Sequence, residues 1–126
     1  MLKELPILSH DSVDAAKLAL AANKQDKYFE MYQKLLSGPG KANKDTALRT
    51  AKELELDVDR LQKDAEDPEI KKALDEAKDL AQKLQLKGTP QFLIGDRVID
   101  GAPEDLFNQL KAKVAEVRQN GCASTC

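Results

Sequence analysis

The chain has 126 residues, which is enough for one modest hydrophobic core but not for two. Its 20 Lys and Arg and 22 Asp and Glu residues give a net charge of -2, so the chain lacks the positive field that attracts nucleic acid or anionic lipid. No apolar run approaches membrane-spanning length, and the N-terminus shows no basic region followed by a long apolar stretch. The charge balance therefore argues against a nucleic-acid-binding protein. The sequence shows neither a membrane anchor nor a secretion signal.

The first elements are a short strand and a helix. Leu5–Leu8 predicts a strand at a sheet edge, because Pro6 cannot donate a backbone hydrogen bond. The next helix is expected to be capped by Asp11 or Ser12, and a break should follow at 23–26. A second helix then carries an aromatic and apolar stripe with spacings of three and four, which favours core packing over a ligand-binding face. The stripe consists of Tyr28, Phe29, Tyr32, Leu35 and Leu36.

Three more helices are predicted before residue 88. Ser37–Gly40 is the clearest loop, and a helix follows from about Asp45 to Leu54. Asp57 begins a short helix that runs through Leu61. The sequence Asp67-Pro68-Glu69 is a strong helix start, with a capping acceptor, proline at the first helical position and a carboxylate near the positive end of the dipole.

The segment 88–101 organises the C-terminal part of the chain. Gly95-Asp96 separates two apolar runs, which predicts an antiparallel hairpin with a tight turn. Pro90 opens the first strand, where a missing N–H costs little, and the preceding Gly-Thr pair makes Thr89–Pro90 a candidate for a cis peptide bond. An amphipathic helix should then begin near Ala102-Pro103-Glu104 and stop at Asn120-Gly121.

A Thr-Pro pair that opens a hairpin strand between a long helix and a C-terminal amphipathic helix resembles the cis-Pro loop of the thioredoxin-like superfamily, and its DsbA-like branch most closely. Lys3–Leu8, Ser12 and Ala15–Ala22 resemble the second strand and the entry to the helical insertion of that branch. The resemblance runs from about Leu2 to Val117. It implies an α/β, thioredoxin-like fold that is helix-rich, with a helical insertion at about 11–86, an incomplete small sheet, and a C-terminal β-hairpin and helix.

The resemblance also implies that the domain is truncated. In DsbA-like proteins a first strand and a Cys-x-x-Cys at the start of the first helix precede the point where this sequence begins. We therefore expect a single truncated domain at 1–120 and a flexible, cysteine-containing tail at 121–126. The missing strand would lie between 5–8 and 91–94. Three responses are expected: direct pairing of those strands, a homodimer that completes the sheet, or marginal stability.

The function that the resemblance implies is thiol-disulfide exchange on thiol- or disulfide-containing protein substrates, in the periplasm or outside the cell, with no cofactor and no metal. Thr89 would pair with the extended substrate peptide, and Pro90 would be the cis-proline. The redox cysteines of the family map onto no residue of this sequence. We therefore expect the chain to be inactive or incomplete by itself.

The two cysteines, Cys122 and Cys126, are weak catalytic candidates. Their spacing is one residue longer than the redox motif, and they follow a helix end instead of opening a helix, so nothing obvious lowers a thiol pKa. The competing interpretations are an idle tail, a local disulfide, intermolecular cross-links or an appended remnant. His10 is interpreted as a solvated loop residue. The acidic residues at 57–67 lack the glycine and the ligand spacing of a calcium-binding loop.

Two alternative functions stay open. The first is a non-catalytic module that uses the loop for peptide binding, or a helical interaction domain. The second is a glutathione-linked enzyme of the kappa-transferase type, which is similar to this branch and also uses the cis-Pro loop. Reduction of a model disulfide separates oxidoreductase from binding module, and glutathione binding that depends on Thr89 would favour the transferase.

Overall fold

The computed structural model describes residues 1–123, and these divide into two compact units. Unit 1 comprises residues 1–84, and unit 2 begins at residue 85 and is described as far as residue 123. The described residues form six α-helices and one two-stranded antiparallel sheet. None of those helices is both long enough and apolar enough to cross a membrane.

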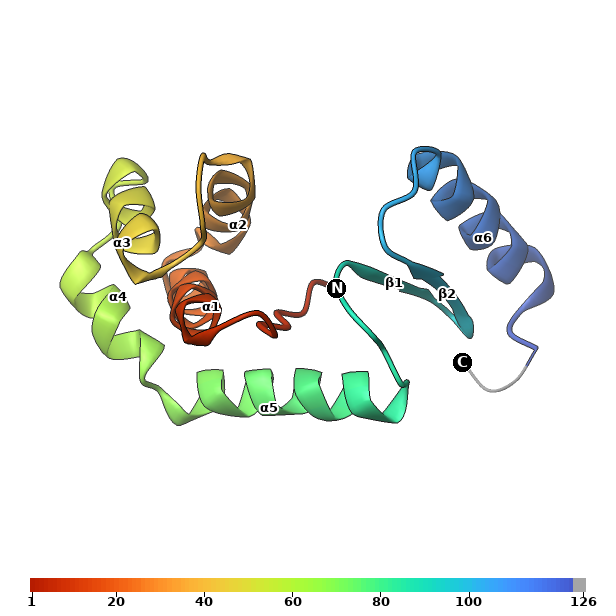
Figure 1. Cartoon of the computed structure of the whole chain (residues 1–126), viewed down its shortest axis with the longest axis horizontal. Coiled ribbons are helices and arrows are strands. Elements are labelled where there is room, and N and C mark those ends of the chain that lie inside the picture. The colour runs from red at the N-terminus through yellow and green to blue at the C-terminus, as the bar shows by residue number, and fades with distance from the viewer. Residues whose placement is uncertain (124–126) are drawn as a thin grey trace. The chain divides into compact units, whose positions relative to one another are not determined.

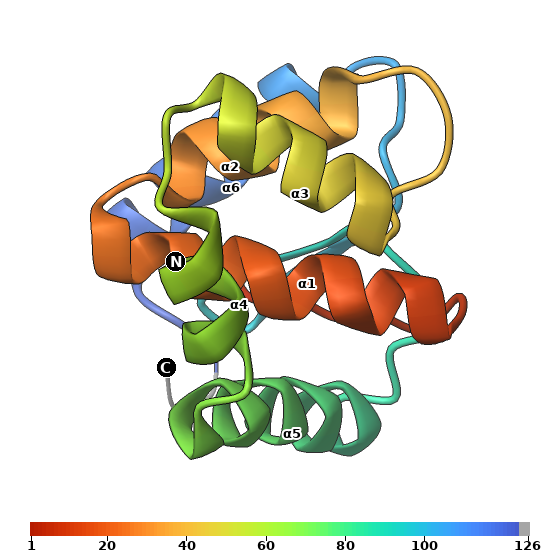
Figure 2. The same cartoon turned by 90° about the vertical axis from the view of Figure 1, so that its left-hand side faces the viewer.

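Unit 1 is built around its first helix. Its helices are α1 (His10–Ala22), α2 (Tyr28–Ser37), α3 (Lys44–Glu53), α4 (Val58–Ala65) and α5 (Pro68–Lys83), with a 3-10 turn η1 (Asn23–Gln25) after α1. The helix α1 contacts each of the other four, and Figure 2 shows α2 and α3 on one side of it and α5 on the other. The helical prediction for this part of the chain is confirmed.

The core of unit 1 consists mainly of small side chains. Alanines on α1 and α3 are almost completely buried, and such residues allow helices to approach closely. Met31 and Leu61 are the largest fully buried side chains and fill the space that the alanines leave. Because deleting methylene groups from a packed core leaves a cavity, these two residues should dominate the packing energy of the unit.

Helix starts follow side-chain capping. Ser9, not Asp11 or Ser12, caps α1: its hydroxyl accepts the N–H of Ser12 at 3.3 Å, so the sequence prediction was wrong by two or three residues. The cap must lie before the first helical residue, with its oxygen near the third N–H, and Ser9 meets that requirement because the helix already begins at His10.

The other three capped helices start close to where the sequence placed them. Asn43 forms a capping box with Thr46, in which each side-chain oxygen accepts a hydrogen bond from the other residue's backbone N–H at 2.9 Å. Asp57 and Asp67 cap α4 and α5 through the N–H groups of Arg60 and Glu69, at 2.9 Å in both cases. The predicted starts at Asp57 and Asp67 are confirmed.

Among residues 1–123, three residues that are not glycine have a left-handed backbone. Asp26, Glu55 and Gln85 have φ angles of 57°, 57° and 53°, and each lies just after the end of a helix. Glycine usually occupies this position, because a side chain there crowds the backbone. The segments η1, α3 and α5 are therefore each followed by a left-handed residue other than glycine.

The segment before α1 is not a strand. Residues 5–8 form no ladder, so the strand prediction was wrong for this segment. Pro6 lacks an N–H, and the only strands within residues 1–123 are those of the hairpin, so the segment pairs with none. It is attached instead through a side chain: the Tyr28 hydroxyl donates to Glu4 Oε1 at 2.8 Å. Burial raises the pKa of the Glu4 carboxyl, and that hydrogen bond offsets part of the rise.

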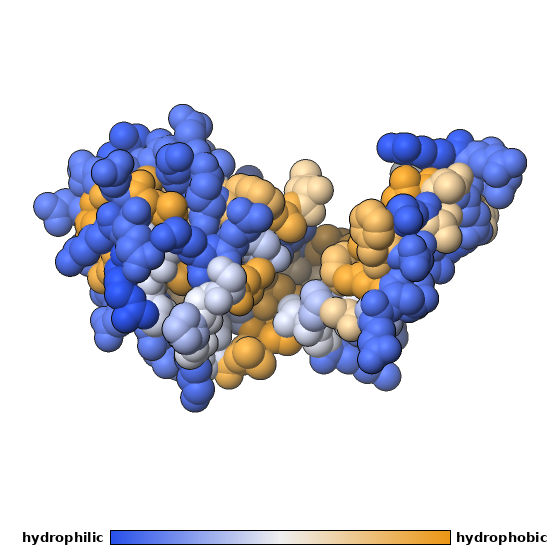
Figure 3. Space-filling model, turned by 90° about the horizontal axis from the view of Figure 1, so that it is seen from above, coloured by the Kyte–Doolittle hydropathy of each residue, from blue (hydrophilic) through white to orange (hydrophobic). Residues whose placement is uncertain are grey.

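The aromatic stripe of α2 is only partly buried. Tyr28 packs against the core and lies 6.1 Å from the Tyr32 ring, measured between centroids. Phe29 and Leu36, however, are 55% and 67% exposed, so core packing does not account for the whole stripe. Figure 3 shows the general pattern of the surface, with apolar side chains in patches between charged ones.

Unit 2 consists of a hairpin and one helix. The strands β1 (Gln91–Ile94) and β2 (Arg97–Asp100) pair antiparallel, and α6 (Leu106–Asn120) packs against β1 (Figure 1). The helix ends where predicted: Gly121 has a φ of 70°, and its N–H donates to the Val117 carbonyl at 2.9 Å. The hairpin and the last helix are therefore confirmed, although α6 begins at Leu106, two to four residues later than predicted.

Candidate functional site

The hairpin turn fixes the register of both strands. Gly95 and Asp96 alone connect them, and Gly95 has a φ of 58°, which two-residue hairpin turns of type II′ require at their first position. The resulting pairs are Gln91 with Asp100, Phe92 with Ile99, Leu93 with Val98, and Ile94 with Arg97.

This register determines which backbone groups β1 leaves free. In antiparallel strands, hydrogen-bonded and non-hydrogen-bonded pairs alternate. The Gly101 N–H donates to the Pro90 carbonyl at 2.9 Å, so Pro90 and Gly101 form a hydrogen-bonded pair, and the next such pair is Phe92 with Ile99. The N–H and C=O groups of Gln91 and Leu93 therefore point away from β2. They form an open edge to which an extended peptide could add.

Thr89 and Pro90 lie where this open edge begins. Both residues are exposed, and the peptide bond between them is cis. Just beyond them, the side-chain amide of Gln91 donates to Asp100 Oδ1 across the hairpin. The carbonyl of Pro90 is already used by Gly101, so the free backbone groups next to Pro90 are those of Thr89 and Gln91.

The two faces of the hairpin differ. Ile99 is 5% exposed, and on the same face Arg97 donates to Glu116 of α6 at 3.0 Å, so this face packs against the helix. The hydrogen bond to Glu116, followed by the charge of Asp96, raises the pKa of the Arg97 guanidinium. On the opposite face Leu93 and Val98 lie across from one another, 43% and 47% exposed. That face is an apolar pair bordered by the polar Gln91–Asp100 contact.

The C-terminal segment reaches the other end of the hairpin. The Ala123 N–H donates to Asp96 Oδ2 at 2.8 Å, which brings Cys122 beside the turn. Cys122 is disulfide-bonded, and Cys126 lies outside the described residues, as do the other residues of the predicted tail beyond 123. Because β1 has four residues, each advancing roughly 3.3 Å, the turn is on the order of 13 Å from Thr89–Pro90. The structure does not bring Cys122 and the Thr89–Pro90 loop together.

The remaining sequence candidates belong to unit 1. His10 is exposed at the first residue of α1, so it belongs to the helix and not to the loop before it. Within residues 1–123, no group of three or more His, Cys, Asp or Glu side chains could hold a metal ion.

The sequence analysis expected a missing strand beside 91–94, but it did not identify which backbone groups of β1 point outward, and it missed the Arg97–Glu116 ion pair. The edge could have been found, because a two-residue turn by itself fixes which residues point outward. The ion pair could not, because it depends on how α6 packs against the hairpin.

Comparison with known proteins supports the same interpretation of the fold. The sequence model of the DSBA-like thioredoxin domain family matches residues 3–112. A thioredoxin-like oxidoreductase from Silicibacter pomeroyi DSS-3 is 40% identical with a TM-score of 0.88, over 93% of this chain and 66% of that protein. The thiol-disulfide exchange protein alpha-DsbA2 from Wolbachia pipientis is 31% identical with a TM-score of 0.82, over 91% and 63%.

A third structure, Proteus mirabilis ScsC in a compact conformation, is 24% identical with a TM-score of 0.80, over 95% of this chain and 65% of that chain, and it supports the fold alone. The search of curated proteins found no match. The chain spans just under two thirds of the length of these solved structures. Its fold is the helix-rich thioredoxin-like fold with a small antiparallel sheet, and the chain belongs to the DSBA-like thioredoxin domain family.

Proposed function

We propose that this chain supplies the substrate-binding part of a thiol-disulfide oxidoreductase, with Thr89 and the open edge of β1 holding an extended segment of a disulfide-containing protein. The observation that carries the proposal is the register of the hairpin. It leaves the backbone groups of Gln91 and Leu93 unused, directly after the exposed Thr89–Pro90 pair. Membership of the DSBA-like family supports the class of reaction.

An extended peptide fits this edge for a physical reason. A strand that adds to β1 would satisfy the outward N–H and C=O groups of two residues, and alternate side chains of the peptide would contact the exposed Leu93. Backbone pairing gives affinity without a strict sequence requirement, as an enzyme that acts on many unfolded or partly folded proteins needs.

Thiol-disulfide exchange also needs a thiolate. The thiolate attacks one sulfur of the substrate disulfide along the S–S axis, a mixed disulfide forms, and the other sulfur leaves as a thiolate; a second thiol then resolves the mixed disulfide. In our proposal Cys122 does not perform this attack at the loop, since it lies at the turn end of the hairpin. The reacting thiols are supplied from outside residues 1–123.

The proposal implies an oxidising compartment, and we place the protein in the periplasm or outside the cell. In that setting a disulfide at Cys122 persists, whereas cytosolic thiol systems would reduce it. This bond would then have a structural effect at the hairpin turn and not a catalytic one.

A proline scan of the two strand edges tests the binding step. Leu93→Pro removes an N–H that points outward from β1, and Val98→Pro removes the equivalent N–H from β2, directly across the hairpin. Neither change removes a hydrogen bond between the strands. The ¹⁵N chemical shifts of the full chain are followed during titration with an eight-residue extended peptide that contains one S-methylated cysteine. We expect Leu93→Pro to weaken binding at least about tenfold, the loss of one or two good hydrogen bonds, and Val98→Pro to leave it unchanged.

The same two variants distinguish backbone pairing from other modes of binding. Equal loss in both variants would mean that the peptide binds the apolar Leu93–Val98 face and not the β1 edge. Binding of reduced glutathione that a Thr89→Ala change abolishes, with no peptide binding, would replace the proposal with the glutathione-linked function. Circular dichroism melts show whether each variant is folded.

A homodimer that completes the sheet competes for the same edge and stays a prediction. If a second copy pairs along β1, Leu93→Pro should convert a dimer to a monomer in light scattering, and Val98→Pro should not.

The role of the cysteines is tested by insulin reduction with wild type and with a Cys122→Ser, Cys126→Ser double variant. We expect wild type and the double variant to have the same insulin-reducing activity. If wild type is active and the double variant is not, the cysteine pair is the redox centre.

A further inference from the structure

An exposed stripe along α6 carries an aromatic ring and two charges without ion-pair partners. Phe107 is 72% exposed, and the Lys111 ammonium lies 4.5 Å from the centre of its ring. Glu104, in the turn before the helix, and Arg118, in its last turn, are exposed as well. Neither of these two charges makes an ion pair with any of residues 1–123. The stripe, completed by the exposed Ala115, is called the α6 stripe below.

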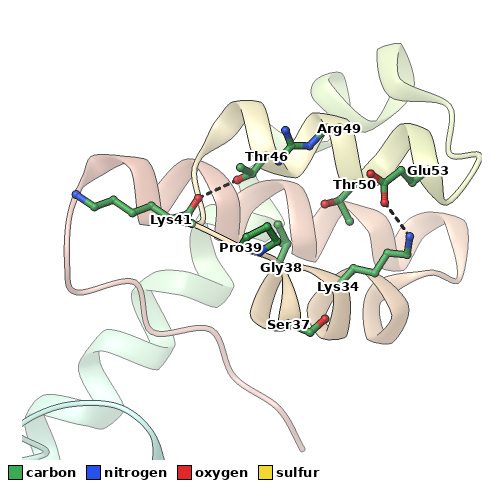
Figure 4. A pocket seen from close by; sticks show the side chains of 11 residues that line it. Lys34, Ser37, Gly38, Pro39, Lys41, Thr46, Arg49, Thr50 and Glu53 are labelled. Carbon is green, nitrogen blue, oxygen red and sulfur yellow. Dashed lines mark hydrogen bonds and ion pairs between the residues drawn. The ribbon is translucent and has the colours of Figure 1, made fainter.

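Other exposed charges of the chain do find partners on neighbouring elements. Lys34 of α2 and Glu53 of α3 pair at 2.8 Å beside a depression of unit 1 (Figure 4). In unit 2, Arg97 of β2 pairs in the same way with Glu116 of α6 at 3.0 Å. The α6 stripe differs because no described element lies against its charges, so a partner for them has to come from another molecule.

The spacing of the α6 stripe is symmetric. Its residues follow one another at steps of three, four, four and three, which keeps them on one side of a helix. The turn that holds Glu104 leads directly into α6, because the Leu106 N–H donates to the Pro103 carbonyl at 3.0 Å. The series of steps is the same from either end, with Lys111 in the middle. Two antiparallel copies of α6 therefore place position 104 of each copy opposite position 118 of the other.

Two such copies are complementary in charge and in size. Glu104 of each copy meets Arg118 of the other, so opposite charges face one another at both ends. Phe107 meets the small Ala115, and a large side chain opposite a small one lets two helices approach. Lys111 lies at the two-fold axis, but each ammonium is held one turn back, over its own Phe107. The two ammonium groups are then roughly 11 Å apart, about a Debye length.

We propose that the α6 stripe binds the α6 stripe of a second copy of this chain, in an antiparallel dimer with two-fold symmetry. The stripe spans roughly 21 Å of helix. That length buries less than the roughly 800 Å² per partner of a standard interface, so the dimer is weak, with a Kd on the order of 10 µM. The dimer uses neither Thr89–Pro90 nor the edge of β1, and it is therefore independent of the proposed thiol-exchange function.

Sedimentation equilibrium of the full chain, at concentrations from about 1 to about 200 µM, tests the dimer. We expect Glu104→Arg and Arg118→Glu each to weaken it at least about tenfold, because each change turns attraction into repulsion at both ends. Asp105→Arg makes the same change of charge at the adjacent residue outside the stripe, and it should leave the dimer unchanged. An equal loss in Asp105→Arg would reject specific pairing along the stripe.

A mixture of the two charge variants gives the sharper result. In a mixed pair, one stripe has two positive ends and the other has two negative ends, so the dimer should return when Glu104→Arg and Arg118→Glu are combined in equal amounts. Failure to recover would overturn the proposal, as would a wild-type chain that stays monomeric over the whole range. Circular dichroism melts show that each variant is folded.

Two further readouts separate this dimer from other ways of associating. Phe107→Ser should weaken the dimer at least about tenfold, and because Phe107 is largely exposed the monomer should stay folded. A dimer that is lost in Leu93→Pro and kept in Glu104→Arg would lie along the β1 edge and would contradict the proposal. A dimer that persists only as a covalent species on non-reducing gels would be a cysteine cross-link and would contradict it as well.

Discussion

The two units of the chain bury their apolar residues to different degrees. Unit 1 holds the continuous core on α1 to α5, with Met31 and Leu61 fully buried. In unit 2, Ile99 is the one buried apolar residue among residues 85–123, and no residue of α6 is buried. The part that carries the candidate site is therefore the part with less core of its own. Binding regions are commonly drawn from the less stable parts of a fold, and this chain follows that tendency.

The difference also has a chemical side. Most of unit 1 is helical, and four of its five α-helices have a side-chain cap, so its helical surface exposes mainly side chains. Unit 2 leaves main-chain groups of Gln91 and Leu93 unused along one strand. A helical surface selects partners by side-chain chemistry, whereas an open strand selects them by extended conformation. The two units thus differ in the kind of surface that they present.

The largest effect should come from truncating one leucine in each unit, a fully buried one in unit 1 and a half-buried one in unit 2. Leu61→Ala should cost about 2–5 kcal/mol in the free energy of unfolding, because it leaves a cavity in the core of unit 1. Leu110→Ala, on the half-buried side of α6, should cost about 1 kcal/mol. Urea denaturation followed by circular dichroism measures both. Similar costs for the two changes would contradict the contrast between the units.

A medium effect is expected at the capping box of α3. Asn43→Ala removes the acceptor for the Thr46 N–H and should cost about 1 kcal/mol in the free energy of unfolding. Lys44→Ala, the adjacent exposed residue, serves as the control and should stay within about 0.5 kcal/mol of wild type. Thermal melts compare the two variants. If Lys44→Ala were the more costly change, capping would not be what stabilises this helix start.

The smallest effect concerns pH. Burial raises the pKa of Glu4, so the folded chain holds this proton more tightly than the unfolded chain. The corresponding stabilisation is complete below the unfolded value near 4.5 and is lost as the pH rises through the folded value. Wild type should therefore gain stability relative to Glu4→Gln as the pH falls from about 7 toward 4.5. A difference in unfolding free energy that stays constant over this range would place Glu4 in solvent.

Much of the fold could be predicted from local signals. Asp67-Pro68 and Gly95-Asp96 specify a helix start and a turn by chemistry that acts within a few residues, and both predictions hold. The strand at 5–8 failed because a strand needs a partner, and partners are not encoded locally. The cap of α1 was misplaced because Ser9, Asp11 and Ser12 can all accept a backbone N–H, and only packing decides among them.

The sites divide along the same line. The position of Thr89–Pro90 and the outward direction of Gln91 and Leu93 follow from a two-residue turn, so the sequence contains them. The Arg97–Glu116 ion pair does not, because it depends on how α6 packs against the hairpin.

Three helical segments are followed by a left-handed residue that is not glycine, so the chain could be made more stable at these positions. Asp26, Glu55 and Gln85 adopt a backbone conformation that costs a side-chain-bearing residue roughly 1 kcal/mol relative to glycine. A single glycine at each position would relieve this strain, without a change to the core or to the hairpin edge. The margin against unfolding in this family member is thus set by what selection tolerated and not by a limit of the fold.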